Sequence, residues 1–238
     1  MDHPATDDPA AVVIVGPGGH RLRPVPLEGE AVRLEPLSRD HLAGLVEVGL
    51  DPAIWTWMFA PVSTPDAMAA WLDAALANAE AGTELPFATV ERASGRVVGS
   101  TRYMSLALEH ARLEIGWTWV APGWQGTAVN TEAKLLQLEH AFERIRCRRV
   151  EFKTDSLNER SRAALLAIGA RFEGVFRKHM IMADGRQRHS AYYSIVDDEW
   201  PAVRDGLRAR LARRAHGGPA SAAPNLPSST RASTREDR

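Results

Sequence analysis

The stretch from Leu113 to Lys134 constrains this chain more than any other. It reads as a strand that ends at Val120, then a loop, Gln125-Gly126-Thr127-Ala128-Val129-Asn130, and then a helix whose apolar residues recur through Ile145. A loop of small residues that leads into a helix N-terminus directs several backbone N–H groups to one point, at the positive end of the helix dipole. We therefore expect a phosphate or pyrophosphate group to bind at residues 125–130.

Composition excludes several classes of protein. The 238 residues suffice for one domain of moderate size with tails, or at most two small ones. The net charge of −1, from 29 basic and 30 acidic residues, argues against a nucleic-acid or membrane-surface partner. No apolar run approaches the ~20 residues of a membrane span, and the N-terminus does not read as a secretory signal. We expect a cytoplasmic protein.

Metal and disulfide sites are not expected either. Cys147 is the single cysteine, which excludes an intrachain disulfide and a cysteine-rich zinc site, and it reads as a packing residue. The eight histidines show no metal-binding spacing, so no metal site is predicted.

The chain divides into three parts by composition. Residues 1–28 are rich in Pro, Gly and Asp and read as an N-terminal arm that is partly ordered. Residues 29–213 carry the periodic apolar patterns of one folded domain. From 214 to 238, Gly, Pro, Ser and Thr dominate and apolar residues nearly vanish, which predicts a disordered C-terminal tail.

Within the domain, strands and helices alternate, but the middle strands are joined as hairpins. Ala93-Ser94-Gly95 is one hairpin turn, and Thr64-Pro65-Asp66 is a clear helix start. An aromatic cluster at residues 55–59 fits either core packing or the wall of a substrate site. The order predicts an α/β (α+β) fold with a mixed, mostly antiparallel sheet and helices on both faces. Strands are expected at 31–37, 86–92, 96–106, 113–120, 149–154, 170–182 and 187–196, and helices at 38–48, 65–82, 130–146, 158–169 and 199–213.

The order of these elements from Ala31 to about Trp200 resembles the GNAT superfamily of N-acetyltransferases. The strand, Val120-Ala121-Pro122 and the loop resemble its acetyl-CoA signature. Further features resemble the Rim-type branch, which includes acetyltransferases of ribosomal-protein N-termini: Glu114-Ile115-Gly116, Asn130-Thr131-Glu132-Ala133, Asn158-x-x-Ser161 and Gly169-Ala170. The resemblance implies that two central strands splay apart around acetyl-CoA.

The resemblance also implies roles for individual residues. The pyrophosphate of acetyl-CoA would lie on the loop residues Gln125, Gly126, Thr127, Ala128, Val129 and Asn130. Backbone groups of Trp119 and Val120 would hold the acetyl end, and Asn158 would bind the pantetheine arm. Ser161 would protonate the leaving thiolate, with Tyr192 and Tyr193 as alternative donors.

Glu114 is the candidate general base, because an amine must lose a proton before it attacks a thioester. Regular strand alternation places Glu114 on one face with Gly116 and Thr118, opposite Leu113, Ile115 and Trp117. An acid beside a glycine leaves room for a substrate. The other interpretation is a strand acid paired with Arg102 or Arg112.

Two departures from the signature leave the function open. Ala128 stands where the signature has Gly, and Asn130 stands where it has Gly or Ala, so a CoA-binding protein without catalysis is the alternative to an enzyme. The arginines of 204–214 suggest a nucleic-acid binder, which the charge balance disfavours. The acceptor is a primary amine, either a protein N-terminus or a small molecule, and a homodimer is one possible assembly.

Overall fold

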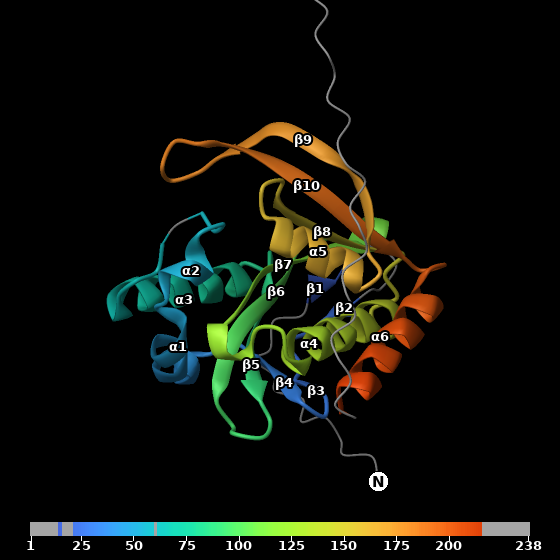
Figure 1. Cartoon of the computed structure of the whole chain (residues 1–238), viewed down its shortest axis with the longest axis horizontal. Helices are drawn as coiled ribbons and strands as arrows, with labels where there is room; N and C mark the ends of the chain where they lie inside the picture. Colours follow the sequence, from blue (N-terminus) through green and yellow to red (C-terminus); the bar gives the residue numbers. More distant parts are fainter. Residues whose placement is uncertain (1–13, 16–20, 60, 216–238) are drawn as a thin grey trace, which may run out of the picture.

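An eight-stranded sheet organises the part of the chain that the computed structural model describes, residues 14–15, 21–59 and 61–215 (Figure 1). The strands are β1 (Ile14–Val15), β2 (Arg21–Leu22), β3 (Leu27–Glu28), β4 (Val32–Pro36), β5 (Leu85–Glu91), β6 (Val97–Ala107), β7 (Arg112–Val120), β8 (Arg149–Asp155), β9 (Arg171–Ile181) and β10 (Gln187–Val196). Their order is β3-β4-β5-β6-β7-β8-β10-β9, and β1 pairs separately with β2. Only β7 and β8 pair in parallel, which confirms the predicted mixed, mostly antiparallel sheet.

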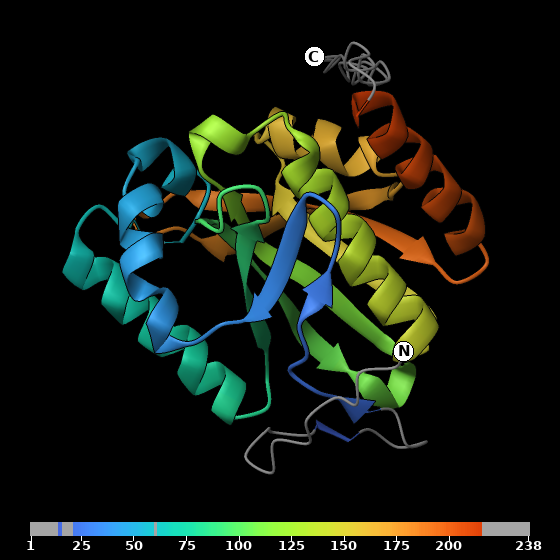
Figure 2. The same ribbon diagram turned by 90° about the horizontal axis from the view of Figure 1, so that it is seen from below.

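Helices cover both faces of this sheet. The helices are η1 (Arg39–His41), α1 (Leu42–Gly49), α2 (Pro52–Trp55), α3 (Pro65–Glu80), η2 (Leu108–His110), η3 (Pro122–Trp124), α4 (Ala128–Glu139), the π-helical turn η4 (His140–Arg144), α5 (Glu159–Ala167) and α6 (Trp200–Ala215). On one face, here the α4 face, α4, α5 and α6 cover a core that runs from β3 to β10. On the other, the α1 face, α1 to α3 cover only β4 to β7. Figure 2 shows these two layers of helices on either side of the sheet.

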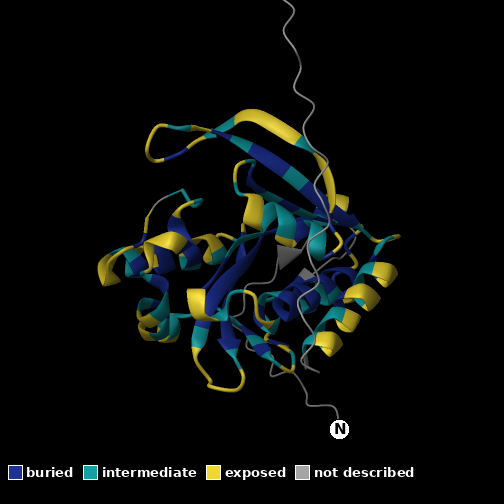
Figure 3. Ribbon diagram, viewed as in Figure 1, coloured by how far each residue is buried: buried dark blue, intermediate teal, exposed yellow. Residues whose placement is uncertain are grey.

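The α1 face of β8 and β10 therefore has no helix over it among the described residues. The edge strand β9 is exposed along most of its length, whereas its neighbour β10 is mostly buried (Figure 3). Polar side chains occupy this uncovered part of the sheet, and they include Glu114, Lys153, Arg188 and Tyr192. The uncovered region lies beside the strand that the sequence singled out.

The predicted aromatic cluster divides between core and surface. The Trp55 ring is buried and contacts Trp71 and Trp119 with centroid distances of 6.0 and 5.6 Å. Trp57 and Phe59 are only partly buried and lie towards β7 and β10, where they contact Trp117, Arg186 and Arg188. One part of the cluster is thus core, and the other part faces the uncovered region.

Helix α4 begins earlier than the sequence suggested. Thr127 is its N-cap, and the Thr127 Oγ1 accepts a hydrogen bond from the Val129 N–H at 3.3 Å. Ala128, Val129 and Asn130 are therefore the first helical turn, and the prediction that they form a loop was wrong. A side-chain hydroxyl that accepts a hydrogen bond from an amide of the first turn stabilises a helix start. The sequence pattern predicted the start at Asn130 instead.

Glu132 joins α4 to the opposite edge of the sheet. Its carboxylate accepts hydrogen bonds from the N–H groups of Glu30, Ala31 and Val32 at 2.9, 2.6 and 2.7 Å. Gly29 is required here, because a Cβ would lie 2.6 Å from the Glu132 carboxyl carbon. Leu22 and Leu27 also pack into the core, so part of the predicted arm at 1–28 belongs to the domain. The predicted tail, apart from 214–215, lies outside the described residues.

Candidate active site

Strands β7 and β8 pair over a short distance and then separate. Their register joins Arg112 to Arg149, Leu113 to Val150 and Glu114 to Glu151, and no later pair forms. Beyond this point β8 stays paired with β10, and β7 stays paired with β6. One edge of β7 after Glu114 therefore has no strand partner among the described residues, which confirms the predicted splay. Backbone groups on that edge that no other described residue binds can bind a ligand.

A bulge interrupts β7 at the place where the strands separate. Trp117 has a φ of +49°, and the register passes from Arg102↔Gly116 to Ser100↔Trp119. The extra residue reverses the later side chains. The Thr118 hydroxyl contacts Lys134 on the α4 face, whereas the Trp117 ring lies against Arg102 on the α1 face. The expectation that Thr118 shares a face with Glu114, opposite Trp117, was therefore wrong.

The backbone at the end of β7 is held by its neighbours. The Trp119 carbonyl lies against Gly99 of β6, because a Cβ on that glycine would be 2.2 Å from the oxygen. The Ala121 N–H donates to the Val98 carbonyl at 2.8 Å. Since N–H and C=O groups alternate in direction along a strand, the Val120 groups face the splayed edge. The Gln125 Nε2 donates to the Val120 carbonyl at 2.7 Å and fixes the turn into α4.

The turn before α4 contains one residue in the left-handed region. Gly126 has a φ of +79°, and a Cβ there would meet no other atom within 4 Å. Neither Ala128 nor Asn130 has a positive φ, so the departures from glycine at these positions impose no backbone strain. The Asn130 Oδ1 is buried and accepts no hydrogen bond from any residue that the structure describes. The site therefore combines the positive end of a helix with an unsatisfied acceptor.

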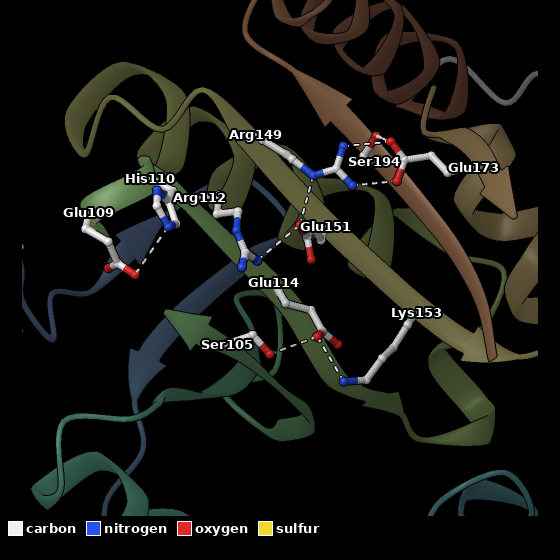
Figure 4. Close-up of polar contacts among 10 residues, drawn as sticks. All are labelled: Ser105, Glu109, His110, Arg112, Glu114, Arg149, Glu151, Lys153, Glu173 and Ser194. Carbon is white, nitrogen blue, oxygen red and sulfur yellow. Dashed lines mark hydrogen bonds and ion pairs between the residues drawn. The ribbon is translucent and has the colours of Figure 1, made fainter. Parts of the chain in front are cut away.

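Glu114 lies on the α1 face at the start of the splay. It is 3% exposed, and its Oε2 accepts hydrogen bonds from the Ser105 hydroxyl at 3.1 Å and the Lys153 ammonium at 3.0 Å (Figure 4). Its Oε1 lies towards Gly116, but Met104 fills the space over this glycine, since a Cβ there would lie 2.5 Å from the Met104 Sδ. The expected room for a substrate beside Gly116 was therefore wrong. The suggested partners Arg102 and Arg112 were wrong.

Those two arginines bind other carboxylates. Arg102 pairs with Glu84 at 2.7 Å, and Arg112 pairs with Glu151 at 3.2 Å. Lys153 reaches Glu114 because β8 runs parallel to β7 and places the Lys153 side chain on the α1 face, where Glu114 also lies. A pairing across 39 residues carries no local sequence signal.

Asn158 and Ser161 lie together at the N-terminus of α5, on the α4 face. The Asn158 Oδ1 accepts a hydrogen bond from the Ser161 N–H at 3.0 Å, so Asn158 is the N-cap of this helix. Ser161 is partly buried, and no described group bonds its hydroxyl. Glu114 and Ser161 thus lie on opposite faces of the sheet. A ligand that contacts both would pass between β7 and β8, where the two strands separate.

The two tyrosines of β10 also face opposite ways. Tyr193 is fully buried on the α4 face, where its hydroxyl accepts a hydrogen bond from Arg162 at 3.0 Å. Tyr192 lies on the α1 face, opposite Lys153 in the strand register. Burial raises the pKa of the Tyr192 phenol, and the charges of Glu114 and Glu151 raise it further. The phenol therefore keeps its proton at neutral pH.

The C-terminal arginines of α6 lie beside the turn before α4. The Arg214 guanidinium donates to the Gly126 carbonyl, and Arg210 donates to the Ala167 carbonyl at 2.8 Å. Burial lowers the pKa of Arg210, and the charges of Arg214 and Arg213 lower it further. None of these three pairs with a carboxylate among the described residues, whereas Arg208 on the same helix pairs with Glu139. The basic pattern of 204–214 therefore reaches the loop through Arg214 at its C-terminal end.

Metal-ligating clusters, membrane-spanning helices and hollows can be located in the described residues. In the described part of the chain, no three potential metal-ligating side chains come together. No described helix is long and apolar enough to cross a membrane. A hollow of about 410 Å³ between α5 and α6 is lined by residues that include Gly169, Val203 and Arg210, and Glu114 is not among them.

Comparisons with known proteins give the context of this site. Residues 31–171 match the family described as acetyltransferase (GNAT) domain. A GCN5-related N-acetyltransferase from Brucella melitensis is 34% identical, with 79% of this chain and 86% of that chain covered and a TM-score of 0.74. A structure described as an acetyltransferase from T. thermophilus is 38% identical, with coverage of 79% and 97% and a TM-score of 0.73. RimJ from Mycobacterium smegmatis, in complex with CoA-disulfide, is 25% identical, with coverage of 80% and 94% and a TM-score of 0.65. Among curated proteins, none matches the sequence.

Proposed function

The chain belongs to the GNAT acetyltransferase family, and on that premise we propose that it transfers an acetyl group from acetyl-CoA to a primary amine. The observation that carries this proposal is the splay of β7 and β8 beside the N-terminus of α4. One element offers unpaired backbone groups along an edge, and the other offers free amides at a positive helix end. Acetyl-CoA supplies an activated acetyl thioester and a pyrophosphate, which match these two elements.

The residues present fit acetyl-CoA. The N–H groups of Gly126, Ala128 and Asn130 are proposed to hold the pyrophosphate, and Val129 contributes through its hydrogen bond to the Thr127 cap, which fixes this turn. The buried Asn130 Oδ1 is proposed to accept a hydrogen bond from an amide of the pantetheine arm, since it has no partner in the described protein. The Gln125 side chain supports the site indirectly, because its amide donates a hydrogen bond to the Val120 carbonyl and holds the end of β7 in place.

The residues around the splay support direct attack by the amine. The Val120 N–H, rather than a group of Trp119, is proposed to polarise the thioester carbonyl, because the Trp119 carbonyl faces β6. Such a donor contributes roughly 3 kcal/mol to acyl transfer. Asn158 and Ser161 border the same opening from α5, and Ser161 is the proposed proton donor to the thiolate because no described group engages its hydroxyl.

Glu114 is proposed to take the proton of the amine. The Lys153 ammonium and the Ser105 hydroxyl both bind Oε2, so Oε1 is the oxygen proposed to accept the proton, directly or through a water. Tyr192 lies on the same face with its proton retained, and it is the alternative donor to Ser161. Tyr193 is bound to Arg162 within the core and has no such role.

The cluster of Arg210, Arg213 and Arg214 is proposed to attract the phosphates of the cofactor. Of these cations, Arg214 contacts the Gly126 carbonyl, and none of the three has a carboxylate partner in the described chain, so a phosphate group would supply the missing negative charge. The sequence showed the basic pattern but not its position, because the packing of α6 against α4 joins segments far apart in the chain.

A CoA-binding protein without turnover remains the second candidate, because the Lys153 ammonium and the Ser105 hydroxyl already occupy Oε2 of Glu114. A thiol-release assay distinguishes the two. We expect acetyl-CoA to bind and free thiol to appear only when an amine is added, from a panel of amino acids, polyamines, aminoglycosides and peptides with free N-termini. CoA binding with no amine-dependent release from any of these would favour the second candidate, and no CoA binding would refute both.

A further inference from the structure

The charged residues on the uncovered α1 face leave one buried cation without a carboxylate. Lys153 pairs with Glu114 at 3.0 Å, and Arg186 pairs with Asp155 at 2.7 Å. Further along, Arg149 and Arg112 both bind Glu151, and Arg149 also binds Glu173 (Figure 4). Arg188 belongs to the same face but forms an ion pair with no described carboxylate.

Arg188 is nevertheless buried. The residue is 5% exposed, and its Nε is sealed from solvent without a hydrogen-bond partner among the described residues. Its guanidinium lies over the Phe59 ring, 5.4 Å from the centroid. Burial lowers the pKa of this guanidinium, and the charge of Asp155 opposes that effect without a direct contact. A buried charge without a partner destabilises a fold, so its natural complement is a ligand.

The position of Arg188 connects it to the site around Glu114. Strand alternation on β10 places Arg188 on the same face as Tyr192, which lies opposite Lys153 in the register. The Phe59 ring that contacts Arg188 also contacts the ring of Trp117, with centroids 5.8 Å apart. Trp117 is the bulge residue at the splay, where the acetyl group is expected. The Arg188 guanidinium is therefore connected to that place through the ring of Phe59 and then the ring of Trp117.

We propose that Arg188 binds a carboxylate of the acceptor, and that the acceptor is therefore a small amino carboxylate whose amine meets Glu114. This inference depends on the proposed acetyl transfer and specifies its substrate class. A guanidinium binds a carboxylate through two parallel hydrogen bonds and so fixes the orientation of the molecule. The rings of Phe59 and Trp117 form the wall along which the carbon chain between the carboxylate and the amine lies.

A matched substrate series tests this proposal in the full-length protein. Initial rates of thiol release are measured with α-, β- and γ-amino acids and with the carboxamide of each, at saturating acetyl-CoA. We expect at least one amino acid to exceed its carboxamide in kcat/KM by roughly 10- to 100-fold, the range expected for a charged hydrogen bond. Equal rates within every pair would overturn the inference while leaving acetyl transfer intact.

Variants of Arg188 separate recognition from folding. R188Q should raise KM for the amino acid by roughly 10- to 100-fold, change kcat little, and leave the carboxamide unaffected. The control is R177Q, which removes an exposed charge on β9 and should change neither value. Because Arg188 is buried without an ion pair to any described residue, the thermal midpoint of R188Q should not fall.

Three results would contradict this account. An equal loss of activity towards both members of a pair would show a structural role for Arg188. Faster transfer to peptides with an acidic N-terminal residue than to every free amino acid would assign the guanidinium to a protein substrate. The absence of transfer to any amine would refute the proposed function itself, and this inference with it.

Discussion

Lys134 provides a quantitative test of the packing beneath the splay. Its ammonium group is buried between α4 and the sheet, and it donates to Thr101 Oγ1, Thr118 Oγ1 and Gln137 Oε1 at 2.9, 2.8 and 2.9 Å. All three acceptors are neutral. Burial lowers the pKa of Lys134 from 10.5 to about 7. The difference corresponds to about 5 kcal/mol of unfolding free energy, at 1.36 kcal/mol per pH unit.

The sign of the effect follows from proton binding. Between pH 7 and 10.5 the unfolded chain binds a proton at Lys134 and the folded chain does not, so stability rises with pH across this range. Below pH 7 both states bind the proton, and the full destabilisation is present without further change. Burial also raises the pKa of Cys147 to about 12 and that of Tyr103 above its usual value, so those groups reduce stability at higher pH. Wild type and K134M share these groups, so their contribution cancels when the two proteins are compared at pH 6.5 to 8.5.

The variant K134M isolates this contribution, because methionine fills a similar volume without a charge. Denaturant unfolding should show wild-type stability rising by about 1.2 kcal/mol between pH 7.5 and 8.5 relative to K134M, since most of the maximal slope applies there. The exposed Lys178 serves as the control, and K178M should run parallel to the wild type. A constant difference between wild type and K134M across this range would refute a depressed pKa at Lys134.

Three further changes test the roles assigned to individual side chains. Glu114→Gln should lower kcat by ~10²-fold or more, most at pH values below the pKa of the amine, with unchanged affinity for acetyl-CoA; a flat pH–activity ratio to wild type would remove Glu114 as the base. Glu132→Ala should lower the unfolding free energy by roughly 3–5 kcal/mol, because three backbone amides lose their acceptor, and chemical denaturation measures this. Replacing Arg213 and Arg214 by Gln should weaken CoA more than dephospho-CoA, whereas the paired control Arg208→Gln should not distinguish them.

Local signals predicted much of the fold. Thr64-Pro65-Asp66 marked the start of α3, and the Thr64 side chain caps that helix as expected, with the Ala67 N–H as donor at 3.2 Å. The turn at Ala93-Ser94-Gly95 joins β5 to β6, with Gly95 at a φ of +68°. Such features depend on neighbouring residues alone, so a single sequence contains them.

The candidate site was harder to predict because it depends on contacts between distant segments. The bulge at Trp117 places a bulky residue at positive φ, which no local propensity favours. The partner of Glu114 is Lys153, which comes from β8. That Arg188 has no carboxylate partner among the described residues is seen only in the structure, where the carboxylates near it pair with Lys153 and Arg186 instead. Alternation along β7 was a sound rule up to Gly116, and the extra residue then reversed it.

The position of the helix start changed the interpretation of the loop. With Thr127 as the N-cap, Ala128 and Asn130 need no left-handed conformation, so their departure from glycine does not argue against phosphate binding. Thr127→Asp is a clean perturbation for the same reason, because aspartate also caps helices well and adds a negative charge at the proposed phosphate site.

A calorimetric titration of CoA into the wild type, T127S and T127D tests the central claim most directly. We predict binding to the wild type and to T127S, and a loss of roughly tenfold or more for T127D, since a carboxylate beside the pyrophosphate is repelled. Thermal unfolding should show that T127D remains folded. Equal affinity in all three proteins would contradict the claim that the N-terminus of α4 is the cofactor site.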